Sequence, residues 1–495
     1  MCLWSALHGL IQPIVVPNMQ PSYPRDMIGY GAHPPEVNWP HKARIAVQFV
    51  LNYEEGGENN ILHGDDASEA FLSEIVGAQP WQGQRHMNME SIYEYGSRRG
   101  FWRLYDLFSE RNIPVTVFGV ASAMQRNPDC LKAMLDARWE IATHGLKWID
   151  YRNVPKETER DHIEQAIAIH QDLTGARPLG IYQGRTSENT LNLSMQEGGF
   201  LYSADSYADD LPYWVYGPHG PQLIVPYTLD ANDMRFATPQ GFNTGDQFFT
   251  YLKDSFDHLY AEGTKAPKML SIGLHCRLVG RPGRAQALVR FLDYIQSVPD
   301  VWCATRLDIA RHWIAHHPPK DGYSPAGLSR ALFCAVFGGV YEHSPWIAEA
   351  VCTATSGPSV STAVELSVLM RKVVEQSNRD QKLSLINAHP DLSGKLAQAK
   401  LLTPDSYIEQ TSAGLDQLTA DERDQFAQLN EAYKLKFGFV FIIAVRGKSK
   451  QEILSAFKKR LAHSADDEFA EALVQIHQIA LLRIKSIFER VSAPS

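Results

Sequence analysis

The sequence predicts an α/β barrel of alternating strands and helices, followed by a separate all-α domain. Short apolar runs rich in β-branched residues recur through the first 310 residues, and helical patterns separate several of them. This alternation is typical of a parallel sheet with crossover helices. Because seven or eight such units occur without a GxGxxG turn, we expect a distorted (β/α) barrel rather than an open dinucleotide-binding sheet.

The barrel elements are predicted from these two patterns. The expected strands are 45–51, 115–120, 140–143, 179–182, 201–203, 223–227, 269–274 and 301–304. The expected helices are 91–110, 129–137, 156–174, 245–262 and 283–297. Polar residues follow most of the strands: Asn52, Glu54, Glu55, His144, Arg185, Asp205, Asp230 and His275. Since the carboxyl ends of barrel strands face one mouth, we expect an active site there.

A stretch rich in proline and glycine, residues 317–327, is predicted to link the two domains. We therefore divide the chain into an N-terminal arm (1–24), a barrel (25–316), this linker, and an all-α domain (328–495). In the last helix, apolar residues recur at steps of three or four from Phe469 to Ile487, and Ser464 with Asp467 predicts its start. The apolar run 437–445 is either a strand or a buried helix.

Composition excludes some classes of protein. The chain is 44% hydrophobic and 21% charged, as in ordinary globular proteins, and its net charge of -9 argues against nucleic-acid binding. Six scattered cysteines without a CxxC motif favour a reducing compartment, so we expect a cytoplasmic protein. No run of 18 apolar residues predicts a membrane span. The first residues lack a basic region and contain prolines, which favours an arm over a signal peptide, and the C-terminus is not a Ser-Lys-Leu-type signal.

The barrel mouth offers residues for hydrolysis. Glu54 and Glu55 are adjacent carboxylates that could hold a metal, or one could be a general base whose pKa the other raises. His275 is the best candidate for the acid, and Arg185 could bind a carbonyl or an anionic intermediate. The alternative interpretation is that the paired carboxylates lie in a solvated turn.

Residues from about 25 to 315 resemble the polysaccharide deacetylase superfamily, whose fold is a distorted (β/α) barrel. That family has a Thr-Phe-Asp-Asp-Gly motif, with one Asp as base and the next as metal ligand, where this chain has Asn52-Tyr53-Glu54-Glu55-Gly56. It also has a metal-binding His-x-x-x-His, where this chain has His144 and Trp148. Because tryptophan has no lone pair for a metal, the resemblance does not imply zinc-dependent deacetylation.

These departures resemble the metal-independent allantoinases, a branch of the same superfamily. The matching strings are NYEEGGEN (52–59), LHGD (62–65), THG (143–145), WIDY (148–151), GR (184–185), SIGLHCR (271–277) and GRPGR (280–284). The resemblance implies opening of the allantoin ring to allantoate without cofactor or metal. It implies Glu54 as base and His275 as acid, and the residues expected to bind the substrate are Glu55, His144, Arg185 and Trp148. Whether Glu54 or Glu55 is the base stays open.

The all-α domain offers residues for decarboxylation. His389 suits proton transfer near neutral pH, and Glu409 could hold its imidazole or bind ureido N–H groups. Arg446, after the apolar run, could anchor an anionic substrate. Taken singly, His389 is better explained as a histidine at a helix end, Glu409 as a solvated helix residue and Arg446 as a surface charge.

Residues from about 328 to 490 resemble the 2-oxo-4-hydroxy-4-carboxy-5-ureidoimidazoline (OHCU) decarboxylases, small all-helical enzymes of urate degradation. The matching strings are FGGVYEHSPW (337–346), AHPDL (388–392), LT (402–403), EQTSAGL (409–415) and YKLKFGF (433–439) through position 446. The resemblance implies His389 and Glu409 as catalytic residues, and Ser406, Arg446 and Pro390 as substrate ligands, without a cofactor.

Together the two resemblances imply a bifunctional enzyme of urate catabolism, because the decarboxylase makes the (S)-allantoin that the allantoinase opens. We expect small-molecule substrates, no nucleic-acid or membrane partner, and a homo-oligomer. Two alternatives stay open for the barrel: a metal-dependent polysaccharide or chitooligosaccharide deacetylase, or a non-catalytic binding module that supports the decarboxylase.

Overall fold

The structure is a computed structural model that describes residues 24–75, 77–319, 325–353, 356–392, 406, 409–411, 413–415 and 417–492. The chain divides into two units, 1–36 and 37–495. The described part of the first unit is a mostly exposed segment in which Asp26 Oδ1 accepts hydrogen bonds from Ile28 N and Gly29 N. Most of the predicted N-terminal arm lies outside the described residues.

A nine-stranded sheet forms the centre of the barrel. Its strands are β1 (Ile45–Tyr53), β2 (Val115–Gly119), β3 (Glu140–Thr143), β4 (Gly180–Ile181), β5 (Tyr202–Ser203), β6 (Tyr213–Gly217), β7 (Gly220–Ile224), β8 (Lys268–His275) and β9 (Val301–Cys303). They lie in the order β6-β7-β5-β4-β3-β2-β1-β8, with β9 also paired to β1. A single parallel bridge between Asn232 and Gly273 joins the chain after β7 to β8, so the sheet curves back on itself as a distorted barrel.

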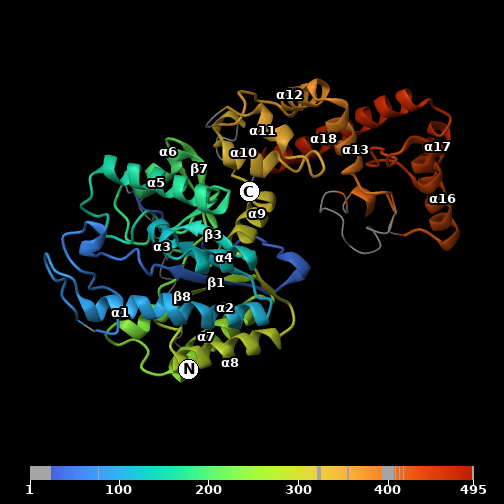
Figure 1. The fold of residues 1–495 in the computed structure, drawn as a ribbon. Helices are drawn as coiled ribbons and strands as arrows, with labels where there is room; N and C mark the ends of the chain where they lie inside the picture. The colour runs from blue at the N-terminus through green and yellow to red at the C-terminus, as the bar shows by residue number, and fades with distance from the viewer. Residues whose placement is uncertain are drawn as a thin grey trace, which may run out of the picture. The chain divides into compact units, whose positions relative to one another are not determined.

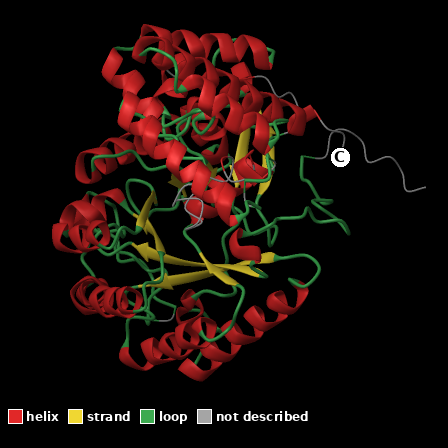
Figure 2. Cartoon of the chain, turned by 90° about the vertical axis from the view of Figure 1, so that its right-hand side faces the viewer, coloured by secondary structure: helices red, strands yellow, loops and turns green. Residues whose placement is uncertain are grey.

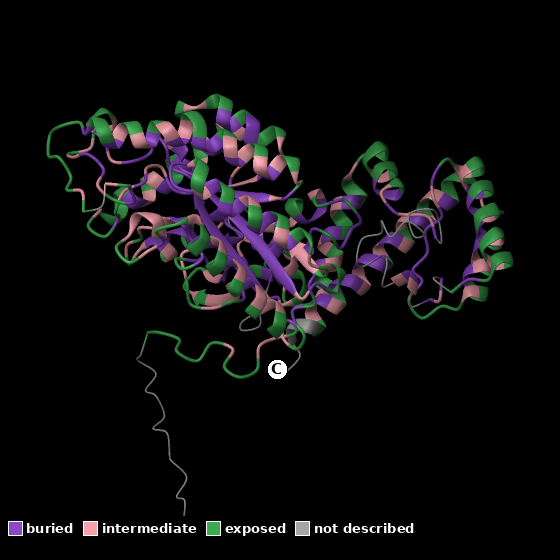
Figure 3. Ribbon diagram, turned by 90° about the horizontal axis from the view of Figure 1, so that it is seen from below, coloured by how far each residue is buried: buried purple, intermediate pink, exposed green. Residues whose placement is uncertain are grey.

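Strand register brings the predicted polar residues to one end of this sheet. In β1, Asn52 lies opposite Phe118 on β2 and opposite His275 on β8, and all these pairings are parallel. On the next strand, Gly119 of β2 lies opposite Thr143, the residue before His144. Glu54, His144 and His275 therefore leave neighbouring strands at the same edge. Every residue of β1 is buried, as expected for a central strand covered on both faces (Figure 3).

Helices flank the sheet (Figures 1 and 2). They are α1 (Met87–Tyr95), α2 (Phe101–Glu110), α3 (Ala121–Arg126), α4 (Pro128–Asp136), α5 (Lys156–Thr174), α6 (Thr190–Glu197), α7 (Gly245–Glu262), α8 (Pro282–Gln296) and α9 (Arg306–His316). The predicted helix 91–110 is interrupted by a π-helical turn at Gly96–Gly100. There a Cβ on Gly100 would lie 2.0 Å from Cys276 O, so the helix can approach β8 closely only with glycine at this position.

Among the described residues of the C-terminal part, the regular structure is helical, as predicted, apart from an isolated antiparallel bridge between Ser329 and Ser356. Its helices are α10 (Arg330–Phe337), α11 (Trp346–Val351), α12 (Ala363–Gln376), α13 (Arg379–Asn387), α16 (Ala420–Phe437), α17 (Lys450–Arg460) and α18 (Ala465–Ser492). The start of α18 follows the prediction, with Ser464 Oγ accepting from Asp467 N at 3.2 Å. Capping boxes begin α12, α13, α16 and α17. No helix in the described parts of the chain is long and apolar enough to cross a membrane.

The apolar run 437–445 takes neither of the two forms that its composition suggested. Helix α16 ends at Phe437, with Gly438 in the left-handed conformation (φ 77°), and the residues that follow form a buried segment without regular secondary structure. The backbone N–H of Ala444 in this segment donates a hydrogen bond to Gln475 Oε1 of α18. Periodicity could not predict this outcome, because a buried segment of irregular structure has no period.

Candidate active sites

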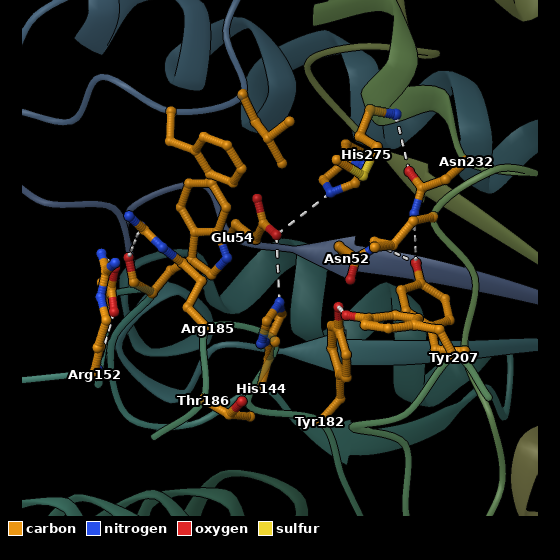
Figure 4. Close-up of a pocket in the computed structure, with 18 residues that line it drawn as sticks. Asn52, Glu54, His144, Arg152, Tyr182, Arg185, Thr186, Tyr207, Asn232 and His275 are labelled. Carbon is orange, nitrogen blue, oxygen red and sulfur yellow. Dashed lines mark hydrogen bonds and ion pairs between the residues drawn. The ribbon is translucent and has the colours of Figure 1, made fainter. Parts of the chain in front are cut away.

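The mouth of the barrel contains a cavity of about 570 Å³ (Figure 4). Charged, amide and aromatic side chains from most of the strand ends line it: Asn52, Glu54, His144, Trp148, Asp150, Arg152, Tyr182, Arg185, Tyr207, Tyr227, Asn232 and His275, with Phe71, Leu72, Gly184, Thr186, Leu229 and Met234. Five of the predicted barrel site residues, Glu54, His144, Trp148, Arg185 and His275, are in this set. The structure thus brings together side chains that are more than 200 positions apart in the sequence.

Glu54 lies between two histidines in this cavity. Its Oε1 is 3.3 Å from His144 Nε2 and 3.5 Å from His275 Nε2, and all three side chains are almost fully buried (Figure 4). Within the described residues, His144 Nδ1 has no hydrogen-bond partner, whereas Nε2 faces the Glu54 carboxylate. A buried imidazole in this state is available to bind a polar group of a ligand.

His275 is held from behind by a carboxylate that the sequence did not single out. Its Nδ1 lies 2.6 Å from Asp233 Oδ1, while Asp233 Oδ2 accepts from the backbone N–H groups of His275 and Val279 at 2.8 and 2.9 Å. Burial lowers the pKa of His275, but the charges of Glu54 and Asp233 outweigh it and raise this pKa to about 9. His275 is therefore protonated at neutral pH.

Arg277 is a second residue of this site that sequence reasoning did not assign. Its guanidinium is fully buried, with Nη2 2.7 Å from Glu54 Oε2 and Nη1 3.6 Å from Glu55 Oε1. Burial raises the pKa of Glu54, but the charges of Arg277 and His275 hold it well below its usual range. The carboxyl group of Glu54 is accordingly ionised.

Glu55 points away from the cavity. Its Oε1 accepts from Arg277 N at 3.1 Å and its Oε2 from Glu54 N at 3.2 Å, and burial raises its pKa. Asp205 and Asp230 are also absent from the cavity lining: Asp205 accepts from the N–H groups of Gln183 and Gly184, and Asp230 accepts from Thr228 and Tyr251 hydroxyls. These carboxylates shape the loops around the site.

Trp148 and Arg185 form one wall of the cavity. The Arg185 guanidinium carbon lies 5.0 Å from the centre of the Trp148 ring and 5.2 Å from that of Phe71. Arg185 Nη1 donates to Trp148 O at 3.4 Å and lies 3.5 Å from Glu69 Oε2. The Arg185 side chain is about one-fifth exposed and lines the cavity, so its guanidinium can donate to a ligand.

The helical domain contains a second, smaller cavity of about 30 Å³. Its lining combines polar groups with the apolar segment after α16: His389, Pro390, Leu392, Ser406, Glu409, Gln410, Phe441, Ile442, Ile443, Val445, Ile479 and Arg483. His389 Nδ1 bonds to Leu385 O at 2.9 Å. Because a carbonyl only accepts, Nδ1 carries the proton and Nε2 is the basic nitrogen. Burial lowers the pKa of His389 to about 4, so its imidazole is neutral at physiological pH.

A buried arginine from α18 organises the acidic side of this cavity. Arg483 donates to both carboxylate oxygens of Glu409 at 3.0 and 2.9 Å, and its Nη1 lies 2.8 Å from Glu342 Oε2. Ser406 Oγ donates to Glu342 at 3.0 Å and accepts from Arg483 Nη2 at 3.2 Å. The structure therefore groups Glu409 with Arg483, whereas His389 is oriented by a backbone carbonyl.

Arg446 is the one predicted site residue of this domain that lies apart from the cavity. It is exposed, its Nη1 donates to Ser486 Oγ at 3.0 Å, and it is absent from the cavity lining. The residues just before it, Phe441 to Val445, do line the cavity. Arg483 is thus the arginine that the structure brings together with Ser406 and Glu409, and sequence reasoning missed it because it lies 74 positions from Glu409 inside a regular helical pattern.

Comparison with known proteins matches each of the two parts of the chain to a protein family. The polysaccharide deacetylase model matches residues 88–196, and the OHCU decarboxylase model matches residues 326–485. A Schizosaccharomyces pombe protein named "Putative polysaccharide deacetylase" is 43% identical over 60% of this chain and 98% of its own length. An OHCU decarboxylase of Haloferax volcanii is 40% identical over 32% of this chain and 89% of its own length.

The chain belongs to both the polysaccharide deacetylase and the OHCU decarboxylase families.

Among solved structures, the crystal structure of PuuE allantoinase resembles the deacetylase-family barrel closely. It is 62% identical, covers 60% of this chain and 99% of that chain, and superposes with a TM-score of 0.60. The barrel fold predicted from the sequence is thereby confirmed, as is the helical fold of the decarboxylase-family domain.

The deacetylase-family barrel does not fit the metal ion that its family implies. Trp148 stands where the second histidine ligand is expected and has no lone pair to offer. The Arg277 guanidinium already compensates the paired carboxylates. Within the described residues, no group of three or more His, Cys, Asp or Glu side chains is arranged to hold a metal ion.

Proposed function

We propose that this chain catalyses two reactions: its helical domain decarboxylates OHCU to (S)-allantoin, and its barrel hydrolyses the allantoin ring to allantoate. The observation that carries the barrel activity is the ionised Glu54 between two imidazoles on a cavity wall completed by Trp148. This arrangement pairs a base with a protonated acid. It accords with the close similarity of the barrel to an allantoinase.

In the barrel, Glu54 takes a proton from a water molecule, and the oxygen of that water attacks the ring carbonyl carbon. His144 and Arg185 bind the carbonyl and ureido groups, and the oxyanion that forms is stabilised by these donors. The C–N bond of the ring then breaks, and His275 delivers its proton to the leaving nitrogen. The open product carries a carboxylate and a second ureido group. Glu54 suits the role of base better than Glu55 because its carboxylate faces the cavity.

Incubation of the purified chain with racemic allantoin in the presence of a chelator tests the barrel activity. We expect allantoate to form at the same rate with and without the chelator, and the residual optical rotation to report which enantiomer is consumed. Stoichiometric zinc that is lost together with activity would instead support a metal-dependent deacetylase. If no allantoate forms even without the chelator, the barrel would be a non-catalytic module.

In the helical domain, the neutral His389 suits a proton shuttle. OHCU carries a hydroxyl and a carboxylate on one ring carbon, whereas allantoin has a carbonyl there and a new hydrogen on the neighbouring carbon. His389 Nε2 takes the hydroxyl proton as CO2 leaves. The electron pair of the broken C–C bond moves through the neighbouring C=N carbon onto its ring nitrogen, which takes up a proton from solvent. His389 Nε2 then returns the hydroxyl proton to one face of the neighbouring carbon as the carbonyl forms, which gives one enantiomer.

The acidic side of the cavity binds the rest of the substrate. Glu409 and Ser406 offer acceptors for ureido N–H groups, and Arg483 holds both in place. The apolar segment before Arg446 excludes water. A cavity of about 30 Å³ has room for roughly two water molecules, so it must widen when the substrate binds.

The variant His389→Asn tests the decarboxylase activity. It is expected to abolish CO2 release from OHCU while allantoin hydrolysis by the same chain persists.

We also propose that residues 25–316 and 328–495 are the two catalytic domains, with 317–327 as linker. This division is supported by the end of α9 at His316 and the start of α10 at Arg330. A cytoplasmic location is supported by the described cysteines, all of which are free thiols. Homo-oligomerisation remains a prediction, which the mass of the native particle would test.

A further inference from the structure

The guanidinium of Arg277 lies among the groups that a metal ion would need. Its two terminal nitrogens face Glu54 Oε2 at 2.7 Å and Glu55 Oε1 at 3.6 Å, and its centre is 5.2 Å from the Trp148 ring. Glu54 Oε1, the other oxygen of the same carboxylate, faces His144 Nε2 at 3.3 Å. One cation therefore lies between two adjacent buried carboxylates, next to the side chain at position 148.

Arg277 is held in this position by contacts with buried groups. It has no solvent exposure, and its Nε donates to Leu72 O at 3.1 Å. Its own backbone N–H donates to Glu55 Oε1, and its guanidinium lies 4.4 Å from the centre of the Tyr93 ring. Two carboxylates, two aromatic faces and a carbonyl surround this guanidinium, and they keep its positive charge in place inside the barrel.

Trp148 and Arg277 fit each other as a pair. An indole ring offers the largest cation-attracting face of any side chain, and Trp148 directs that face at the guanidinium. A histidine at position 148 would offer a lone pair instead, but a divalent ion held by it would lie beside a buried guanidinium. Two cations side by side in a buried site of low effective dielectric constant repel strongly. The tryptophan and the arginine are therefore compatible with each other, and each is incompatible with a bound metal.

We propose that Arg277 is the built-in cation of the barrel site: its guanidinium takes the place and the electrostatic role of a metal ion, and Trp148 completes its pocket. Arg277 is a positioning residue, because it holds the Glu54 carboxylate as an anion beside His144 and does not line the substrate cavity. The catalytic part of this proposal rests on the hydrolytic function proposed above, whereas its metal-exclusion part does not.

Metal binding tests the exclusion without any substrate. Co²⁺ is titrated into the parent chain, Trp148→His, Arg277→Met and the double variant, and binding is read from the visible absorption of the bound ion. Only the double variant is expected to bind one Co²⁺ per chain, at least 100-fold more tightly than the parent. Adding His144→Ala to the double variant should remove this binding if the ion occupies the predicted position.

Two outcomes would overturn the proposal. If Trp148→His alone binds Co²⁺ as tightly as the double variant, Arg277 does not exclude a metal. If the double variant has the circular dichroism of the parent and binds no ion, the guanidinium does not occupy a cation site. Neither outcome depends on whether the barrel hydrolyses allantoin.

Activity tests the electrostatic role. Arg277→Lys keeps the positive charge and is expected to retain hydrolysis within about 10-fold, whereas Arg277→Met is expected to lower kcat by about 100-fold with little change in KM. Decarboxylation by the same chain serves as the measure of folded enzyme. Equal loss in both variants would reduce Arg277 to a packing role and overturn this part of the proposal. Failure of the parent to hydrolyse allantoin would instead refute the proposed function and leave the Co²⁺ result standing.

Discussion

Asp233 Oδ1 lies 2.6 Å from His275 Nδ1, on the side of the imidazole opposite to Glu54. The histidine thus stands between two carboxylates, one of which fixes its orientation and the other of which faces the cavity. The backbone N–H groups of His275 and Val279 hold the Asp233 carboxylate in turn. This chain of bonds determines which nitrogen is presented to the substrate and how firmly the proton is held.

The first prediction concerns pH. The folded-state pKa of His275 is raised to about 9 from an ordinary 6.5, so the acid form is present at lower pH and is lost as the pH rises through about 9. Allantoin hydrolysis should therefore fall on the alkaline side with that midpoint. Asp233→Asn removes one of the two charges that raise this pKa and should move the midpoint toward neutrality. An unchanged alkaline midpoint in this variant's pH–rate profile would contradict the assignment of His275 as the acid.

A second prediction separates the two adjacent carboxylates of β1. Glu54→Gln should lower kcat for hydrolysis by about 10²–10⁴, because the group that accepts the proton from water is lost. Glu55→Gln is the matched variant and should cost far less activity, since this side chain faces Arg277 rather than the cavity. Rates of allantoate formation measure both. The reverse order of effects would make Glu55 the base.

The third prediction concerns the helical domain. Because burial lowers the pKa of His389 to about 4, decarboxylation should stay level below neutrality and fall only as the pH approaches that value. The unfolded chain binds this proton at an ordinary pKa of 6.5, so the folded state also loses stability as the pH falls from 6.5 toward 4. Circular dichroism at each pH separates unfolding from protonation. A midpoint near 6.5 in the folded enzyme would show that His389 is not the titrating group.

A fourth prediction compares two arginines. Arg483→Met leaves the buried carboxylates of Glu342 and Glu409 without their cation, and should destabilise the helical domain by about 3–5 kcal/mol and abolish decarboxylation. Arg446→Met removes one exposed hydrogen bond and should change the free energy of unfolding by less than about 0.5 kcal/mol. Urea denaturation and CO2 release measure both variants. Loss of activity in Arg446→Met alone would restore Arg446 as the substrate-binding arginine.

The strands and helices that could be predicted from the sequence are those marked by a local pattern of apolar and polar residues. The strands from β1 to β3 and β8 were predicted within two residues, because each is a compact apolar run bounded by polar residues. The strand β6 and the helices α3 and α6 were missed, since their short sequences carry no clear period. The irregular apolar segment after α16 was missed for the same reason. Helix α9 was also missed, although its buried residues Ile309, Ala310, Trp313 and Ile314 have helical spacing.

The site shows the same limit. Glu54, His144 and His275 could be predicted because each directly follows or ends a strand, and parallel strands bring such residues to one edge. Asp233, Arg277 and Arg483 could not be assigned, because their roles depend on burial beside a partner that is distant in sequence. Charged residues that look like ordinary loop or helix surface in the sequence become buried partners only in the folded chain.

The central claim is that one chain carries both reactions and that its hydrolase needs no metal. The most direct test supplies freshly generated OHCU to the purified protein in the presence of a chelator and follows CO2, allantoin and allantoate over time. The account predicts CO2 release followed by allantoate formation, with a yield that the chelator does not change. A reaction that stops at allantoin, or that reaches allantoate only after a metal is added back, would contradict it.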